Sequence, residues 1–137
     1  MDAKLRTEMG AERMLAEVSD AGATVHFIGF KTKKELAVYY KAADVFCLPT
    51  KSDVWGLVIN EAMSYGLPVV TTDMCIAGLT LLTPEQVAKV DNVEELAEKI
   101  CNLLDNENGL GQRNYKLIQD YTNETMAAEH MRILEKL

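Results

Sequence analysis

Residues 49–70 read Pro-Thr-Lys-Ser-Asp-Val-Trp-Gly-Leu-Val-Ile-Asn-Glu-Ala-Met-Ser-Tyr-Gly-Leu-Pro-Val-Val. This stretch places Asp53 in a loop after an apolar run, and Glu61 inside a helix that Gly56 begins. A second apolar run follows Gly66, which is a typical helix stop. Strand, acidic loop, helix and second strand form a βαβ unit. Such a unit binds ligands at the carboxyl ends of its parallel strands, so the pattern points to a nucleotide-type ligand.

The alternation of apolar runs and amphipathic stretches continues on both sides of this unit. It predicts short buried strands at 25–28, 45–48, 68–71 and 86–90. It predicts helices over 2–20, 32–43, 56–65, 93–105, 110–120 and 122–136, with Asn92 as a cap and Leu57 among the inward-facing residues of the third helix. Residues 72–83 are expected to form a loop with a turn at Gly78. Strands and helices that alternate in this way indicate an α/β fold with a parallel sheet flanked by helices.

The composition is that of an ordinary globular domain: 137 residues, 48% hydrophobic and 26% charged. The net charge of −7 argues against nucleic acid or an anionic membrane as the main partner. The sequence has no apolar run near the roughly 20 residues that a membrane-spanning helix needs, and no signal-peptide pattern opens it. A cytoplasmic location is therefore expected.

The start of the helix at Gly56 has the features of an anion-binding site. Glycine lets a ligand approach the backbone closely. The free amides of Gly56, Leu57 and Val58, together with the helix dipole, can receive phosphate oxygens or sugar hydroxyls. Lys51 lies in the same loop and is a candidate for a phosphate contact.

The two acids of the unit suit a sugar ligand. A carboxylate such as Glu61 can accept hydrogen bonds from two vicinal ribose hydroxyls, as acids do in dinucleotide-binding folds. Asp53 could hold sugar hydroxyls or stabilise positive charge at a reacting anomeric carbon. Taken without their surroundings, two acids at this spacing are more often a loop acid and a solvated helix residue than a binding site.

The segment from Val25 to Asp73 resembles the C-terminal, donor-binding domain of retaining glycosyltransferases of GT-B fold, the family called glycosyltransferases group one. The family pattern is an acid, seven residues and a glutamate. Asp53 stands where the family usually has glutamate, and Glu61 holds the second position. Further matches are Gly56-Leu57-Val58, Glu61-Ala62-Met63, Phe27-Ile28-Gly29-Phe30, Ala43-Asp44-Val45-Phe46 and Val93-Glu94-Glu95-Leu96-Ala97.

The resemblance implies a hexosyltransferase that uses a nucleoside-diphosphate sugar donor and requires neither a metal nor another cofactor. Glu61 would bind the donor ribose, and Asp53 would bind the transferred sugar as the catalytic residue. The amides of Gly56, Leu57 and Val58 would face the sugar and diphosphate. A role in cell-surface polysaccharide or glycoconjugate synthesis is implied. A membrane-associated acceptor, with the full-length enzyme peripheral to the membrane, is one possibility.

The family's donor domain begins with two strands, preceded by an acceptor-binding domain, and this chain starts after both. Residues 1–137 are therefore expected to be one partial nucleotide-sugar-binding domain, a truncated half of a Rossmann-like fold, inactive alone. In a sheet ordered 3-2-1-4-5-6 the missing strands would be the central pair. The strands at 25–28 and 45–48 would then pair with each other, or a second chain or the missing N-terminal domain would fill the gap. The alternative is a non-catalytic α/β module that oligomerises or complements a partner.

Overall fold

The computed structural model describes residues 22–105 and 109–135. The chain divides into two compact units, residues 1–33 and 34–137. The helix expected over 2–20 lies outside the described residues. Residues 23–29 have no regular secondary structure, so the strand predicted at 25–28 is wrong. A strand needs a neighbour for its amides and carbonyls, and among the described residues none pairs with this segment.

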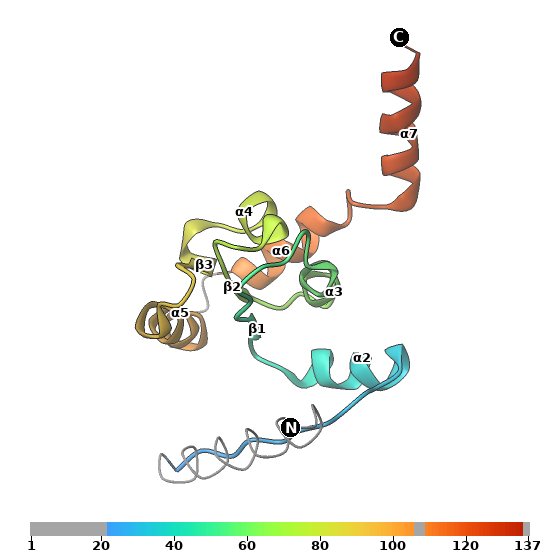
Figure 1. Cartoon of the computed structure of the whole chain (residues 1–137). Helices are drawn as coiled ribbons and strands as arrows, with labels where there is room; N and C mark the ends of the chain where they lie inside the picture. The colour runs from blue at the N-terminus through green and yellow to red at the C-terminus, as the bar shows by residue number, and fades with distance from the viewer. Residues whose placement is uncertain (1–21, 106–108, 136–137) are drawn as a thin grey trace, which may run out of the picture. The chain divides into compact units, whose positions relative to one another are not determined.

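A parallel sheet of three strands lies at the centre of the second unit (Figure 1). It is formed by β1 (Phe46–Leu48), β2 (Val69–Thr72) and β3 (Val87–Ala88), in that order. Residue 46 is opposite 69, and 71 is opposite 87. These strands confirm the predictions at 45–48, 68–71 and 86–90. Within the second unit β1 pairs with β2 alone. The pairing of 25–28 with 45–48, one of the two predicted alternatives, would join the two units and stays a prediction.

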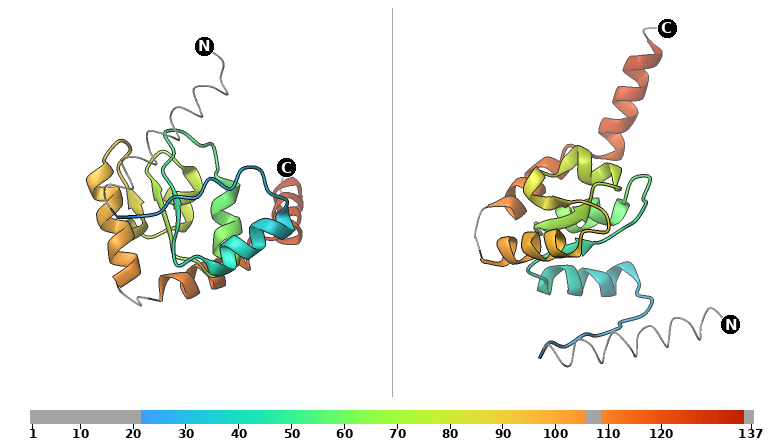
Figure 2. Two further views of the ribbon diagram at one scale, coloured as in Figure 1. Left: turned by 90° about the horizontal axis from the view of Figure 1, so that it is seen from below. Right: turned by 60° about the vertical axis from the view of Figure 1, so that its left-hand side comes forward.

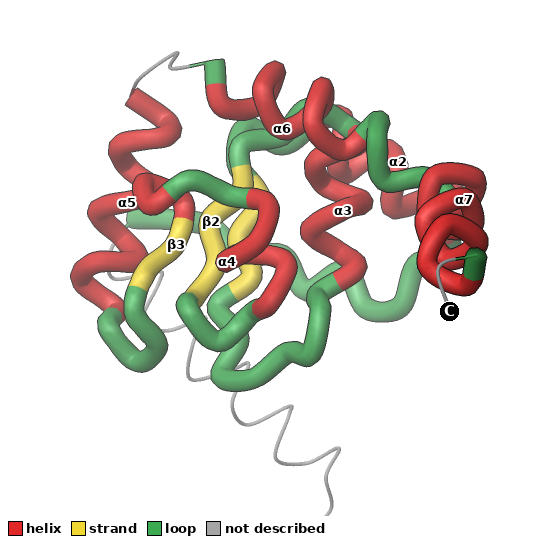
Figure 3. The backbone as a smooth tube through the Cα atoms, turned by 90° about the horizontal axis from the view of Figure 1, so that it is seen from above, coloured by secondary structure: helices red, strands yellow, loops and turns green. Residues whose placement is uncertain are grey.

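Six helices accompany this sheet in the described chain. They are α2 (Lys33–Ala42), α3 (Leu57–Ser64), α4 (Ile76–Leu81), α5 (Val93–Asp105), α6 (Leu110–Ile118) and α7 (Asn123–Leu134), with a short 3₁₀ helix η1 (Pro84–Gln86). Figure 3 shows α5 on one side of the strands and α3 on the other, with α6 next to α3. Figure 1 and the right-hand view of Figure 2 show α7 extending away from the sheet, and α7 has no buried residue. The Rossmann-like α/β class is confirmed.

The helix α4 occupies the segment that was expected to be a loop. Gly78 lies inside this helix and is buried, so its prediction as a turn is wrong. A Cβ atom added at Gly78 would overlap the Cγ2 atom of Thr71 on β2. The absence of a side chain at Gly78 therefore allows α4 to approach the sheet closely. In the sequence the same glycine looks like a helix breaker.

The core lies where α3 packs on β2. Ile59, Ala62 and Met63 of α3 are fully buried, together with Val69 of β2. Leu57 is 70% exposed, so its predicted inward orientation is wrong. The position is two residues before Ile59, which turns it about 200° around the helix axis and away from the core face.

The ends of α3 and α5 follow the predicted signals. Gly66 adopts the left-handed conformation, with φ of 77°, directly after α3, and its amide donates to the carbonyl of Met63. The Oδ1 atom of Asn92 accepts from the amide of Glu95 at 3.1 Å, which confirms the predicted cap of α5. In the part of the chain that the structure describes, no helix is long and apolar enough to cross a membrane.

Candidate functional site

Residues 49–56, here called the site loop, leave the carboxyl end of β1 and lead into α3. Two threonines of β2 anchor its start. Thr71 Oγ1 donates to the carbonyl of Leu48 at 2.9 Å, and Thr72 Oγ1 donates to the carbonyl of Thr50 at 2.6 Å. These hydroxyls continue the contact between β1 and β2 past the end of the ladder. The site loop therefore begins at a fixed position on the edge where parallel sheets bind ligands.

The second half of the site loop is held by the residues around the start of α4. The Asp53 amide donates to the carbonyl of Met74 at 3.0 Å. The carbonyl of Trp55 accepts from the Ala77 amide at 2.9 Å and from Cys75 Sγ at 3.2 Å. The loop after β1 and the loop after β2 are thus joined through their backbones.

Gly56 starts α3 in a conformation that suits glycine. Its φ of 84° is in the left-handed region, and a Cβ atom there would lie 2.6 Å from Cys75 Sγ. The first helical bond runs from the Ile59 amide to the Gly56 carbonyl at 2.8 Å. No hydrogen bond of the Leu57 or Val58 amide is found within the described residues. These are the unsatisfied amides that a helix start presents to an anion.

Asp53 is half-buried in the site loop. Its Oδ1 atom accepts from the Trp55 amide at 3.1 Å, which forms a local turn. The indole Nε1 of Trp55 donates to Asn60 Oδ1 at 3.1 Å, so Trp55 packs the loop against α3. One carboxylate oxygen of Asp53 therefore takes part in shaping the loop, while the predicted role at a sugar would need the other.

Glu61 lies in α3 and contacts a neighbouring helix. The hydroxyl of Tyr40, on α2, donates to Glu61 Oε2 at 3.3 Å. The pKa of Tyr40 is raised, first by burial of the phenol and then by the negative charge of Glu61. The sequence does not predict this bond, because nothing in the spacing of residues relates the two helices.

Lys51 is the basic residue of the site loop. Its Nζ atom lies 2.6 Å from Asp91 Oδ1, and the two side chains are 80% and 66% exposed. Asp91 adopts a positive φ of 60° in the turn before α5. Both residues help to line a cavity of about 130 Å³. No sequence signal identified Asp91, since the two residues come from loops 40 positions apart.

A larger cavity, of about 800 Å³, opens beside the start of α3. It is lined by Trp55, Leu57 and Asn60 on one side and by the turn between α6 and α7 on the other. Asp53 and Glu61 do not line this cavity. Of the predicted residues, the structure thus joins Gly56, Leu57 and Val58 in one helix start, whereas Asp53, Glu61 and Lys51 each have a separate partner. Their roles stay predictions.

The described part of the chain holds no group of three or more His, Cys, Asp and Glu side chains that could bind a metal ion.

The chain is similar to known glycosyltransferases over most of its length. It is 27% identical over 127 residues to an uncharacterized glycosyltransferase from Haemophilus influenzae, covering 88% of this chain and 35% of that protein. It is 32% identical over 132 residues to a probable sucrose-phosphate synthase from Thermosipho melanesiensis, covering 93% of this chain and 31% of that protein.

The fold also matches a solved structure. Sucrose-phosphate synthase from Thermosynechococcus elongatus superposes with a TM-score of 0.76 and 27% identity, covering 95% of this chain and 34% of that one. The chain thus spans about a third of the length of the relatives that it matches. The sequence model of the family described as Glycosyl transferases group 1 matches residues 11–123, which is most of the 137 residues. The chain therefore belongs to the group 1 glycosyltransferase family, and its fold matches part of a GT-B glycosyltransferase.

Proposed function

We propose that this chain is the donor-binding part of a retaining glycosyltransferase and binds a nucleoside-diphosphate sugar at the start of α3. The observation that carries the proposal is the construction of that helix start. Gly56 packs so closely on Cys75 that a Cβ atom there would overlap the thiol. The amides of Leu57 and Val58 have no hydrogen-bond partner in the described chain. A preorganised set of donors at the carboxyl end of a parallel sheet suits the oxygens of a diphosphate and its sugar.

The charged candidates complete this proposal. Glu61 binds the ribose hydroxyls, Asp53 acts at the transferred sugar, and Lys51 contacts a phosphate. Lys51 reaches a ligand only by leaving Asp91, and because both side chains are largely exposed, that ion pair is weak and readily exchanged. Transfer to an acceptor needs a second domain that closes over the donor. We expect the 137-residue chain alone to bind nucleotide without transferring sugar.

Calorimetry of the purified chain with UDP, GDP and ADP tests donor binding. We expect heat from one of the three nucleotides. The Glu61→Ala variant should bind it at least tenfold more weakly, because hydrogen bonds to a charged group contribute about 1.5–3 kcal/mol. Glu98→Ala is the matched control: it removes the same charge from an exposed position on α5. Equal binding heats for Glu61→Ala and the wild type would show that Glu61 is not part of the site. The absence of heat with all three nucleotides would contradict donor binding by this chain.

One observation favours a second candidate, a module that joins a partner through its sheet. β1 forms an edge of the sheet in the described chain. The Phe46 amide donates to the Pro68 carbonyl, toward β2, so the backbone groups of the next residue, Cys47, face the open edge. Exposed edges of this kind pair readily with another strand. A second copy of the chain could therefore extend the sheet across β1.

Light scattering over a concentration series tests this self-association. If β1 pairs with its copy, the wild type should form a dimer, and Cys47→Pro should be a monomer. Proline removes the amide that faces the open edge, while the bonds of β1 to β2 come from the flanking residues. Cys47→Ala keeps the amide and should remain dimeric. A monomer at every concentration would exclude the edge as a self-association surface.

A further inference from the structure

We propose that Tyr40 is a positioning residue that holds the Glu61 carboxylate ready for the ribose of the donor. This inference rests on the proposed donor binding and adds a residue to it. Tyr40 comes from α2, a helix outside the βαβ unit that carries the site. Its hydroxyl donates to Glu61 Oε2 across 21 positions of sequence. It is the hydrogen bond that the structure gives to this carboxylate within the described residues.

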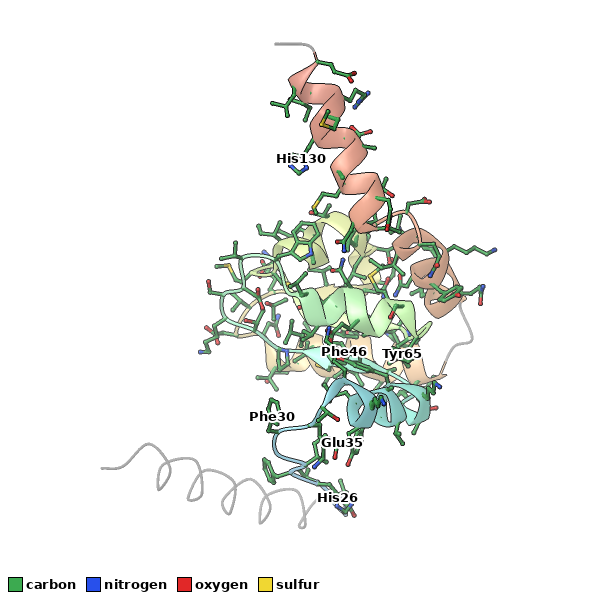
Figure 4. The ribbon with its side chains drawn as sticks, turned by 90° about the vertical axis from the view of Figure 1, so that its right-hand side faces the viewer. His26, Phe30, Glu35, Phe46, Tyr65 and His130 are labelled. Carbon is green, nitrogen blue, oxygen red and sulfur yellow. The ribbon has the colours of Figure 1, made fainter. Side chains whose placement is uncertain are left out.

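The ring of Tyr40 is fixed on two sides. It stacks on Tyr65, at the end of α3, with ring centroids 5.2 Å apart and planes 13° from parallel. It also lies against Phe46 of β1 at 5.8 Å, with the planes tilted by 49°. Figure 4 shows Phe46 and Tyr65 next to each other where α2 approaches α3 and β1. A ring held in this way directs its hydroxyl along one line, toward Glu61.

The other residues of α2 do little to hold this helix in place. No residue of α2 is buried, and its large side chains Val38 and Tyr39 are 65% and 44% exposed. Tyr40 packs against the hydrophobic core of the second unit. Tyr40 therefore has two roles: its ring attaches α2, and its hydroxyl restrains Glu61.

The chemistry of a carboxylate allows this bond and ribose binding together. The two oxygens of an ionised glutamate offer about four acceptor positions, and Tyr40 uses one of them. A free glutamate side chain loses considerable rotamer freedom when a ligand orders it. A carboxylate already restrained by a phenol loses less, so the hydroxyls of a ribose bind it more tightly. At 3.3 Å the bond is long for an O–H donor, which indicates a moderate effect.

Tyr40→Phe tests the proposal, because it keeps the ring contacts and removes the hydroxyl. We expect the nucleotide that binds the wild type to bind Tyr40→Phe about three- to tenfold more weakly, the range of one moderate hydrogen bond. Tyr65→Phe is the matched control from the same ring stack; its hydroxyl makes no hydrogen bond within the described residues. Its affinity should equal that of the wild type.

A spectroscopic titration of the phenols adds a readout that a purely structural role would not change. The pKa of Tyr40 is raised above its ordinary value of 10.0 by burial and by Glu61. Glu61→Gln should lower this pKa, whereas burial of the ring should still hold it above its ordinary value. Because the folded protein holds the Tyr40 proton more tightly than the unfolded chain does, the raised pKa stabilises the fold fully below pH 10. This stabilisation is lost as the pH rises through the pKa of Tyr40 in the folded state.

The outcomes separate this inference from the proposed function. If Glu61→Ala abolishes nucleotide binding and Tyr40→Phe binds as the wild type or more tightly, Tyr40 has no positioning role, while donor binding stands. Equal losses in Tyr40→Phe and Tyr65→Phe would assign the effect to the ring stack and overturn the proposal. An unchanged phenol titration in Glu61→Gln would do the same. If Glu61→Ala binds nucleotide as the wild type does, Glu61 is not part of the site and this inference fails, while donor binding at the start of α3 stands. If none of UDP, GDP and ADP binds the wild type, both proposals fail together.

Discussion

Gly56→Ala should lower the free energy of unfolding by about 2–4 kcal/mol. Two costs add at this position. An alanine strained into the left-handed region, at the φ of 84° found here, costs about 1 kcal/mol. The new methyl group would also lie 2.6 Å from Cys75 Sγ, and this thiol is buried and bonded to the Trp55 carbonyl. Urea denaturation of the two proteins measures the difference.

Two further variants separate these costs. Gly66→Ala introduces alanine at a similar φ of 77° with no atom within 4 Å, so it should cost only about 1 kcal/mol. In a Cys75→Ala background, Gly56→Ala should cost less than in the wild type, because the overlapping sulfur is absent. Equal losses from Gly56→Ala and Gly66→Ala would show that the thiol moves aside freely. In that case the start of α3 is not the rigid element that the donor site requires.

Gly111→Ala should destabilise the fold by about 3 kcal/mol, near the upper end for overpacking. Gly111 lies in α6, and a Cβ atom there would overlap the carbonyl oxygen of Gly66 and come within 3.1 Å of Pro68. Gly66 and Pro68 connect α3 to β2, so the clash is with backbone that cannot rotate away. Thermal and urea unfolding should both show the loss.

The exposed neighbour Gln112 provides the control, because Gln112→Ala on the same helix should change stability by less than about 0.5 kcal/mol. A small effect of Gly111→Ala, similar to that of Gln112→Ala, would mean that α6 can shift outward. The buried Asn114 would then lose its bond to the Leu67 carbonyl, which is 3.2 Å in the structure.

The sheet and most helices could be predicted because their signals are local. The apolar run at Val69–Thr72 is fully buried as the central strand, and Asn92 caps α5 with its own side chain. Two of the errors concern residues whose surroundings decide their state. The segment 25–28 has the composition of a strand but no partner in the described chain. Gly78 looks like a turn and in fact allows α4 to lie against β2.

The candidate site could be predicted only in part for the same reason. The start of α3 at Gly56 follows from one glycine and the helix after it. The bond between Tyr40 and Glu61 and the ion pair between Lys51 and Asp91 join loops and helices that are distant in sequence. Such contacts depend on how elements pack, and neither the period of apolar residues nor a motif contains that information.

The groups that anchor the site loop all come later in the chain than the loop. The hydroxyls of Thr71 and Thr72 on β2 and the backbone of residues 74–77 after it hold the loop. During synthesis the loop therefore leaves the ribosome before its anchors exist, and it can become ordered only when β2 and α4 follow. A nascent chain that stops at residue 70 would contain Asp53 and Glu61 but would lack the groups that give the loop its shape.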